Sequence, residues 1–255
     1  MPTTCITGAS AGLGAAFAEA CAQRGDDLVL VARDRSRLTA AADRLAAGYG
    51  VQVEVLVADL AVEAHRHEVA QRLADPLRPI DLLVNNAGFG PSNRVLAAPE
   101  GETDRAISVM IVAVAELSVA AAQAMVVRGH GRILNVASLS AWITQGSYSA
   151  LKAWVKVFSE GLAEEVRGQG VSVTALCPGW VRTEFHERAQ VTTASIPNWI
   201  WVDASTCATK ALADTAKGKV VSIPTLRWKL AAFGLGIVPR PVVRWISGTL
   251  THSRD

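Results

Sequence analysis

The stretch Thr7-Gly8-Ala9-Ser10-Ala11-Gly12-Leu13-Gly14 decides the fold, because it joins the first β-rich run of the chain to the first Ala-rich segment. Gly8 allows a tight turn there, Gly12 lets the backbone approach a pyrophosphate, and Gly14 lets a helix pack close to a sheet. The free amides and the dipole at the start of that helix would favour the phosphates. The spacing, G-x-x-x-G-x-G, differs from the commonest dinucleotide fingerprint, G-x-G-x-x-G. We therefore predict a phosphate-binding turn, with a purely structural glycine turn as the alternative.

Beyond this turn, β-rich runs alternate with amphipathic segments. Several runs are apolar along their whole length, which is typical of strands covered on both faces in a parallel sheet. The predicted strands are Thr3–Thr7, Leu28–Ala32, Gln52–Val57, Ile80–Asn85, Arg132–Ala137, Val171–Cys177 and Lys219–Ile223. The predicted helices are Ala15–Arg24, Ser36–Ala47, Ala64–Ala74, Glu102–Val127, Tyr148–Gly168 and Ala204–Thr215. This order predicts a single doubly wound α/β domain with a seven-stranded parallel sheet, helices on both faces and right-handed crossovers.

Composition excludes several classes of function. Of the 255 residues, 50% are hydrophobic and the net charge is only +2, so nothing favours nucleic acid as a partner. The cysteines (Cys5, Cys21, Cys177 and Cys207) are far apart, and neither they nor the histidines show metal-ligand or disulfide-framework spacing. The chain starts directly on a strand-like run without room for an export signal, and Leu230–Pro239 is too short to span a bilayer. We expect a soluble, cytoplasmic protein.

The end of the second predicted strand bears on the choice of dinucleotide. A carboxylate there holds the 2′-hydroxyl of the adenosine ribose, whereas an arginine accommodates a 2′-phosphate. Here the small Ala32 is followed by Arg33, and Arg35 and Arg37 add positive charge nearby. NADP(H) is therefore favoured over NAD(H). Asp34 keeps NAD(H) open, because a small backbone shift would bring its carboxylate to the ribose.

Tyr148 and Lys152 lie four residues apart in a predicted helix, so their side chains share one face. A lysine cation beside a tyrosine favours the phenolate and lowers the phenol pKa from its ordinary value of ~10. A general acid–base that works near neutral pH needs such a shift. An ordinary polar pair on a helix surface is the alternative.

At this point the sequence resembles the short-chain dehydrogenase/reductase family, over roughly residues 3–185. The resemblance rests on motifs in a fixed order, each weak by itself. After the glycine turn come Asp59-Leu60, Asn85-Asn86-Ala87-Gly88, Ser138, Tyr148-x-x-x-Lys152 and Pro178-Gly179-Trp180-Val181-Arg182-Thr183. The resemblance implies a Rossmann-type fold, a nicotinamide dinucleotide and a homodimer or homotetramer.

The resemblance also implies roles for single residues. Tyr148 would exchange a proton with the substrate oxygen, Lys152 would also bind the nicotinamide ribose, and Ser138 would hydrogen-bond the substrate oxygen. Asp59 would contact the adenine ring, and the Pro178-Gly179 segment would hold the nicotinamide carboxamide. The expected cofactor-binding residues are Gly8, Ser10, Ala11, Gly12, Leu13, Gly14, Arg33, Asp59, Leu60, Asn86, Ala87, Gly88, Tyr148, Lys152, Pro178, Gly179, Val181 and Thr183.

Two features depart from the family pattern. Family members usually carry an asparagine on the long fourth helix, whose backbone supports a water-mediated proton relay to the lysine, and the best alignment puts Met110 there. The relay would then run through the backbone carbonyl alone, or be slower. The stretch from Ser138 to Tyr148 is also short, so its loop must be tight. Ser140 is the rival for the serine role, and Ser138 is preferred because it directly follows the predicted strand.

The substrate pocket should form above the carboxyl ends of the strands, as is general in open α/β sheets. Aromatic residues are expected to line it together with Ser138, although core packing is an equal alternative for each of them. They are Phe89, Trp142, Trp180, Phe185, Trp199 and Trp201, the last two in a lid over the substrate within residues 184–203. Only Arg182 is placed to bind an anion, so an apolar ketone, aldehyde or alcohol is expected.

The domain would span residues 1–223, and residues 224–255 would form an apolar and basic C-terminal extension broken by Pro224, Pro239 and Pro241. Its apolar surface from Trp228 to Ile246 is expected to pack over the substrate loop or against a partner subunit. Because basic residues lie among the apolar ones, peripheral attachment to anionic lipid is the alternative.

We therefore predict an NADP(H)-dependent oxidoreductase that interconverts a carbonyl and an alcohol on an apolar small molecule. The alternative is a catalytically silent dinucleotide-binding sensor or scaffold with the same fold, which the Met110 departure slightly favours. The set of Ser138, Tyr148 and Lys152 argues against that alternative, because a pure binding module would not need Tyr148.

Overall fold

The computed structural model describes residues 1–90, 95–183 and 197–252 of the chain. Its centre is a sheet of seven parallel strands in the order β3-β2-β1-β4-β5-β6-β9. The strands are β1 (Thr3–Thr7), β2 (Asp27–Ala32), β3 (Val53–Val57), β4 (Leu82–Asn85), β5 (Gly131–Val136), β6 (Val171–Leu176) and β9 (Val221–Ser222). The predicted sheet is confirmed. Strands β7 (Val181–Arg182) and β8 (Val202–Asp203) form a separate parallel pair.

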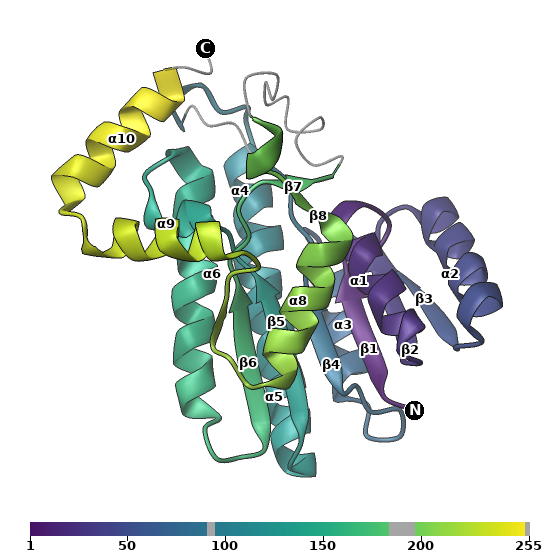
Figure 1. Ribbon diagram of the computed structural model, residues 1–255. Coiled ribbons are helices and arrows are strands. Elements are labelled where there is room, and N and C mark those ends of the chain that lie inside the picture. Colours follow the sequence, from purple (N-terminus) through teal and green to yellow (C-terminus); the bar gives the residue numbers. More distant parts are fainter. Residues whose placement is uncertain (91–94, 184–196, 253–255) are drawn as a thin grey trace.

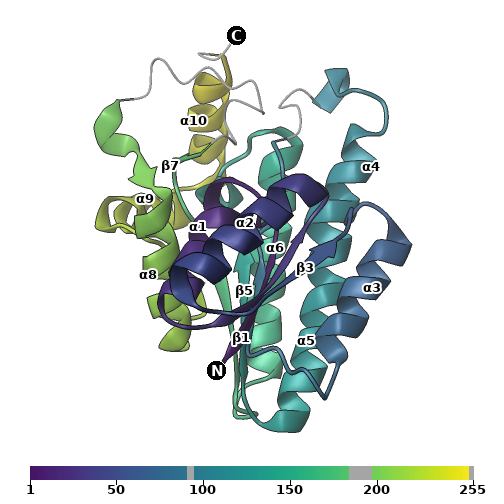
Figure 2. The same ribbon diagram turned by 90° about the vertical axis from the view of Figure 1, so that its right-hand side faces the viewer.

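Helices cover both faces of the sheet (Figure 1). One face carries α1 (Gly12–Gln23), α2 (Arg35–Tyr49) and α8 (Ala204–Ala216), and the other carries α3 (Glu63–Ala74), α4 (Glu102–Ile107), α5 (Ala113–Arg128) and α6 (Gly146–Glu165). Figure 2 shows the two layers from the side. Successive strand residues enter the two cores alternately, so Cys5 is buried in one core and Ile6 in the other.

The connection from β6 to β9 departs from the predicted right-handed crossovers. Strands β4, β5, β6 and β9 follow one another in the same direction across the sheet. Helix α6 packs on one face, whereas α8, which leads into β9, packs against α1 on the other face. A right-handed crossover would have placed α8 on the α6 side. The prediction is therefore wrong for this connection, and the long excursion through β7 and β8 gives the chain the length to change face.

The predicted helix Glu102–Val127 contains a π-helical turn, η2 (Ser108–Val112), between α4 and α5. In this turn the Ala113 N–H donates to the Ser108 carbonyl, five residues earlier. Within the part of the chain that the structure describes, Glu102–Arg128 is the one helix long and apolar enough to cross a membrane. The apolar window of this helix is 44% buried, and it packs against α3 and the sheet. We therefore interpret it as a core helix of the domain.

The C-terminal extension consists of two helices, α9 (Leu226–Ile237) and α10 (Arg240–His252). Pro239 lies between them, and Pro241 is in the first turn of α10, where its missing N–H breaks no helical bond. Helix α9 contacts the short 3-10 helix η3 (Leu139–Trp142), and the Thr144 N–H donates to Ser247 Oγ of α10 at 3.1 Å. The prolines thus end and start helices here.

Two other 3-10 turns, η1 (Val95–Ala97) and η4 (Asn198–Ile200), lie in the connections between other elements.

Candidate active site

The glycine turn follows β1 in the chain. It lies where β1 neighbours β4 in the sheet, which is the point at which the order of the strands reverses. Gly8 has a φ of 67°, and a Cβ on it would lie 2.9 Å from the Ala87 Cα. A Cβ on Gly14 would lie 2.1 Å from the Gly8 carbonyl oxygen. Neither residue can carry a side chain unless the backbone moves, so the tight turn and the close helix–sheet contact both require glycine.

Side chains from β1 and β4 hold this turn in place. Asn86 Nδ2 donates to the Thr7 carbonyl at 3.0 Å and to the Gly8 carbonyl at 3.3 Å. Thr7 Oγ1 accepts the N–H groups of Asn86 at 2.9 Å and Ala87 at 3.0 Å. The Asn-Asn-Ala-Gly segment after β4 is therefore locked to the glycine turn after β1.

The start of α1 is suited to an anion. Its N-cap is Ala11, without a side-chain cap, and its first turn contains no acidic residue. The first N–H groups of a helix have no partner within the helix. A Cβ on Gly12 would approach the Thr183 Cβ to 3.3 Å, so the turn and Thr183 border the same space. Backbone N–H groups, an uncapped helix start and a nearby hydroxyl fit the pyrophosphate of a dinucleotide.

Asp59 lies after β3, but its partners were not foreseen. Arg105 of α4 donates to both of its carboxylate oxygens at 2.8 and 3.0 Å, and the Ala61 N–H donates to Oδ1 at 3.0 Å. Burial would raise the pKa of Asp59, but these bonds and the nearby Arg33 lower it overall. His65 Nδ1 accepts the Asp59 N–H at 3.1 Å. Arg105 and His65 belong to no motif, so only the fold shows that they meet Asp59.

Asp34 acts as the N-cap of α2, since its Oδ1 accepts the Arg37 N–H at 3.0 Å. The backbone shift that would bring Asp34 to a ribose would break this cap. Arg33, directly before it, is exposed and close enough to Asp59 to lower the pKa of that carboxyl. The structure thus gives Asp34 a helix-capping role and leaves Arg33 facing solvent near Asp59.

Ser138, Tyr148 and Lys152 come together beside the end of β5. The Ser138 side chain lies close enough to the Tyr148 hydroxyl to act on its pKa. Lys152 Nζ lies 5.7 Å from the centre of the Tyr148 ring and donates to the Val136 carbonyl at 2.8 Å. Ser138 Oγ also accepts the Ser140 N–H at 3.1 Å. Of the two rival serines, Ser138 is the one that acts on the pKa of the phenol.

Burial sets the protonation of this group. It raises the pKa of Tyr148 to about 12, although the Ser138 side chain acts in the opposite direction. It lowers the pKa of Lys152 to about 8. The phenol pKa is therefore raised and not lowered as predicted, because removal from water outweighs the influence of Ser138.

A buried polar network, which the sequence did not reveal, connects the strands behind these residues. Asn85 Nδ2 donates to Asn135 Oδ1 at 2.9 Å and to Ser118 Oγ at 3.0 Å. Asn135 Nδ2 donates to Ser159 Oγ at 3.0 Å. Asn135 precedes the residue whose carbonyl accepts from Lys152, and Ser159 lies on α6 with Lys152. The network therefore fixes β5 relative to the helix that carries the lysine.

Met110 lies in the π-helical turn and is buried. A Cβ on Gly88 would lie 3.3 Å from the Met110 sulfur and 3.8 Å from Lys152 Nζ. The thioether therefore occupies the neighbourhood of the lysine. Because a thioether is a weak acceptor and no donor, the Met110 side chain cannot donate a hydrogen bond to a proton relay.

The aromatic residues proposed to line the substrate pocket lie in different settings. Trp180 meets Trp201 edge-on, with ring centres 5.5 Å apart, and Arg182 lies over the Trp201 ring at 5.5 Å. The Val202 N–H donates to the Trp180 carbonyl at 2.8 Å, so the β7–β8 pair holds the two indoles together. They form an apolar wall after β6.

Trp142 is half-buried in η3, and Lys156 Nζ lies 5.0 Å from its ring centre. Phe89 packs against the core on the α5 face. Trp199 is 68% exposed. Phe185 lies outside the described residues. The structure therefore brings Trp180 and Trp201 together and does not bring Trp199 to them.

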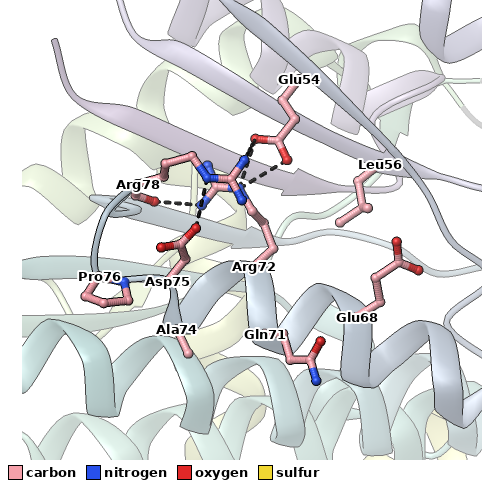
Figure 3. A pocket seen from close by; sticks show the side chains of 9 residues that line it. All are labelled: Glu54, Leu56, Glu68, Gln71, Arg72, Ala74, Asp75, Pro76 and Arg78. Atoms are coloured by element: carbon pink, nitrogen blue, oxygen red, sulfur yellow. Dashed lines mark hydrogen bonds and ion pairs between the residues drawn. The ribbon is translucent and has the colours of Figure 1, made fainter.

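A cavity elsewhere on the described surface does not involve these residues. It has a volume of about 560 Å³ and lies between β3 and the end of α3 (Figure 3). Four of its charged side chains are paired with one another: Arg72 Nε donates to Glu54 at 2.9 Å, and Arg78 Nε donates to Asp75 at 2.8 Å. We interpret this cavity as a surface hollow beside a network of ion pairs that stabilises the fold. No group of three or more potential metal-ligating side chains occurs among the described residues.

Comparison with known proteins agrees with this geometry. A family model described as short chain dehydrogenase matches residues 2–193. The chain belongs to the short-chain dehydrogenase/reductase family. The 3-oxoacyl-(acyl-carrier-protein) reductase FabG of Escherichia coli K12 is 32% identical to it over 182 residues, which are 70% of this chain and 73% of that protein.

Two solved structures of short-chain dehydrogenases and alcohol dehydrogenases are also similar. A short-chain dehydrogenase from Sphingobium yanoikuyae in complex with NADPH is 36% identical, with a TM-score of 0.84 over 94% of this chain and 96% of that one. The bulky-bulky ketone specific alcohol dehydrogenase from Comamonas testosteroni is 32% identical, with a TM-score of 0.80 over 94% of this chain and 96% of that one. The similarity places this short-chain dehydrogenase/reductase among oxidoreductases that use a nicotinamide dinucleotide.

Proposed function

We propose that this short-chain dehydrogenase/reductase is an NADP(H)-dependent carbonyl reductase or alcohol dehydrogenase in which Tyr148 is the general acid–base. The observation that carries the proposal is the position of Lys152, whose Nζ lies 5.7 Å from the centre of the Tyr148 ring, with the Ser138 side chain beside the same hydroxyl. A phenol, a second hydroxyl and a cation around one point are the groups needed to protonate and orient a carbonyl oxygen.

In the reduction direction, the Tyr148 hydroxyl donates its proton to the carbonyl oxygen, and the Ser138 hydroxyl donates a hydrogen bond to that oxygen. The Lys152 ammonium stabilises the phenolate that remains on Tyr148. An ammonium has three N–H donors, and Val136 is the one acceptor it has among the described residues, so donors remain for the nicotinamide ribose hydroxyls. The nicotinamide, when bound, supplies a hydride in reduction and accepts one in oxidation.

The preference for NADP(H) rests on the charge at the end of β2. Arg33 is exposed there, and Asp34, the carboxylate that would favour NAD(H), is engaged as the cap of α2. An arginine at this place accommodates a 2′-phosphate. The NADPH in the Sphingobium yanoikuyae relative supports the same choice.

The substrate we propose is a bulky apolar ketone or the matching alcohol. The half-buried Trp180 and Trp201 provide an apolar wall after β6, and the specificity of the Comamonas testosteroni relative for bulky-bulky ketones supports this class. Arg182 lies over the Trp201 ring and donates to Asn198 at 3.0 Å, so it is engaged within the protein. A negatively charged substrate is therefore not favoured.

Tyr148→Phe tests the proposal, and Tyr49→Phe is its matched control, because the chain has only these two tyrosines. Tyr49 is hydrogen-bonded to Glu19 far from the candidate site. We expect Tyr148→Phe to lower NADPH-dependent turnover of apolar ketones by about 10²–10⁴-fold, with NADPH affinity retained, and Tyr49→Phe to leave turnover unchanged. Equal activity of wild type and Tyr148→Phe would contradict the proposed role.

The alternative, a catalytically silent dinucleotide-binding sensor or scaffold, makes a different prediction. The wild-type protein would bind NADPH tightly but turn over no ketone, aldehyde or alcohol. We favour the enzyme, because a half-buried phenol beside a second hydroxyl and a buried lysine has no evident use in nucleotide binding alone. We further propose a homodimer in the cytoplasm, formed by the outer faces of α5 and α6.

A further inference from the structure

The two C-terminal helices present apolar side chains to solvent. On α9, Leu226, Leu230, Phe233 and Ile237 recur at spacings of four, three and four residues, so they form one stripe along the helix. Each of them is between 64% and 72% exposed. Trp245 of α10 is 71% exposed. We call these five residues the C-terminal surface. Such a concentration of exposed apolar side chains marks an interaction site.

The opposite sides of both helices face the protein. Ala232 of α9 is buried, as are Val243 and Ser247 of α10. Because each residue turns a helix by about 100°, Arg227 and Lys229 lie on either side of the stripe on α9. The C-terminal surface is therefore apolar along its middle and positively charged along its edges.

The charge of this region is strongly one-sided. Residues 224–255 contain five basic residues and one acidic residue, whereas the whole chain contains 25 basic and 23 acidic residues. Anionic lipid matches this pattern, because the apolar stripe enters the acyl boundary while arginine and lysine reach the headgroups. A second copy of the same surface would bring like charges together, which is unfavourable.

The helices that carry the C-terminal surface pack against segments of the candidate active site. A Cβ on Gly179 would lie 2.2 Å from the Trp228 ring, so α9 packs directly on the Pro178-Gly179 segment. Arg227 donates to the Trp201 carbonyl at 2.7 Å, and Thr144, between Ser138 and Tyr148, donates to Ser247. Figure 1 shows both helices toward the end of the sheet where the strands terminate, and α9 contacts η3 there. A partner bound to these helices would lie next to the candidate active site.

These helices also lie beyond the residues that the family model matches, which end at residue 193. We propose that α9 and α10 dock the protein on an anionic lipid bilayer. We propose in addition that its carbonyl substrate is a lipophilic molecule dissolved in that bilayer, and this second part rests on the proposed function. Docking would bring the apolar wall of Trp180 and Trp201 close to the source of such a substrate.

Co-sedimentation of the full chain with vesicles tests the docking. The vesicles contain phosphatidylcholine alone or with about one third phosphatidylglycerol. We expect binding to the anionic vesicles, weaker binding at high salt, and little binding to neutral vesicles. Leu230→Asp with Phe233→Asp should abolish binding, and Arg240→Gln with Arg244→Gln should weaken it about 30-fold.

Leu77→Asp is the matched control, because Leu77 is 90% exposed but lies after α3. It should bind anionic vesicles as the wild type does. Unchanged binding by the Leu230→Asp, Phe233→Asp variant would overturn the docking surface. If the wild type does not bind vesicles and the Leu230→Asp, Phe233→Asp variant has a lower mass in solution than the wild type, the surface is an interface between copies and the docking proposal is overturned.

Turnover separates this inference from the proposed function. With a water-soluble ketone, the Leu230→Asp, Phe233→Asp variant should match the wild type, since neither residue belongs to the candidate site. With a long-chain ketone held in anionic vesicles, only the wild type should be efficient. Vesicle binding without turnover of any ketone would refute the proposed function and the lipophilic substrate, and would leave the docking surface supported. Equal turnover of the long-chain ketone by both proteins would refute delivery from the bilayer.

Discussion

Ser138 and Ser140 lie two residues apart with their hydroxyls 3.2 Å from each other, and Ser138 is the one that acts on the pKa of the Tyr148 phenol. Ser138→Ala should lower kcat/KM for a ketone by about 10²–10³-fold, because one donor to the developing oxyanion is lost. Ser140→Ala should have a far smaller effect, since its side chain contacts Ser138 and not the phenol. Steady-state kinetics of both variants check this. A larger loss for Ser140→Ala would reverse the assignment of the two serines.

Arg33 and Asp34 are adjacent but should have separable effects. Arg33→Ala should raise KM for NADPH by about 10–100-fold and leave KM for NADH unchanged, because a charge-assisted hydrogen bond contributes about 1.5–3 kcal/mol. Asp34→Ala should leave the cofactor preference unchanged and cost about 1 kcal/mol of stability through loss of the α2 cap. Kinetics with both nucleotides and thermal unfolding measure the two effects. A switch toward NADPH in Asp34→Ala would show that the carboxylate reads the ribose.

The pKa of Lys152 predicts a pH dependence. Burial lowers this pKa to about 8, so the side chain is charged below that pH and becomes neutral above it. The value of kcat/KM for NADPH, which reports the protein without cofactor, should therefore be constant below about pH 8 and fall above it. Lys152→Met should be slow at every pH. In Lys152→Arg the value of kcat/KM should no longer fall above this pH, because arginine stays charged. If kcat/KM still falls in that variant, another group is responsible for the pH dependence.

The sequence predicts single residues of the candidate site where a motif marks them. Tyr148, Lys152 and Ser138 were found from spacing and resemblance, and the fold brings them together. The direction of the Tyr148 pKa was missed, because it depends on burial and not on the lysine alone. Arg105 and His65 were also missed, because they reach Asp59 from other elements and carry no local signal.

At the scale of elements, the contact between α9 and the segment after β6 gives a testable coupling. Gly179→Ala would push a methyl group into the Trp228 ring and should cost about 1–3 kcal/mol of stability. In a Trp228→Ala background the space is open, so the same substitution should cost less than about 0.5 kcal/mol. Chemical denaturation of the four proteins of this cycle measures the coupling. Equal costs in both backgrounds would show that α9 does not rest on Gly179.

The secondary structure was predictable where the hydrophobic pattern is regular. The seven strands were found because fully apolar runs alternate with amphipathic segments, and β1 was placed with its observed bounds. The π-helical turn Ser108–Val112 has no local signature in an apolar helix. Helices α9 and α10 were missed because Pro239 and Pro241 suggested irregular structure, although both prolines lie at helix boundaries.

At the scale of the molecule, the sheet could be predicted but the path of the last crossover could not. The right-handed rule follows from the twist of strands joined by a short helical connection. The chain between β6 and α8 is longer and includes β7 and β8, so that constraint is relaxed. The relation between the C-terminal helices and the site also needed the fold, because Trp228 and Gly179 are 49 residues apart.

The outer faces of α5 and α6 lead to a prediction about assembly. Between Arg105 and Arg128 the only charged residue is Glu116, which pairs with Arg66 at 2.8 Å. Val119 is 42% exposed on α5, and Val157 is 62% exposed on α6. Small residues such as Ala120 and Ala124 allow helices to approach closely. The apolar face of α5, together with the exposed Val157 of α6, suits a second copy related by a two-fold axis.

Sedimentation velocity of the wild type should therefore give twice the mass of the chain. The double variant Val119→Glu with Val157→Glu should give the mass of a single chain, because a carboxylate buried in such an interface is strongly unfavourable. Leu77→Glu, at an exposed site outside this face, should remain a dimer. The Leu230→Asp, Phe233→Asp variant should also remain a dimer, because α9 is a different surface. If that variant dissociates and the α5–α6 variant does not, the copies meet through the C-terminal helices, and the lipid-docking surface is excluded by the same experiment.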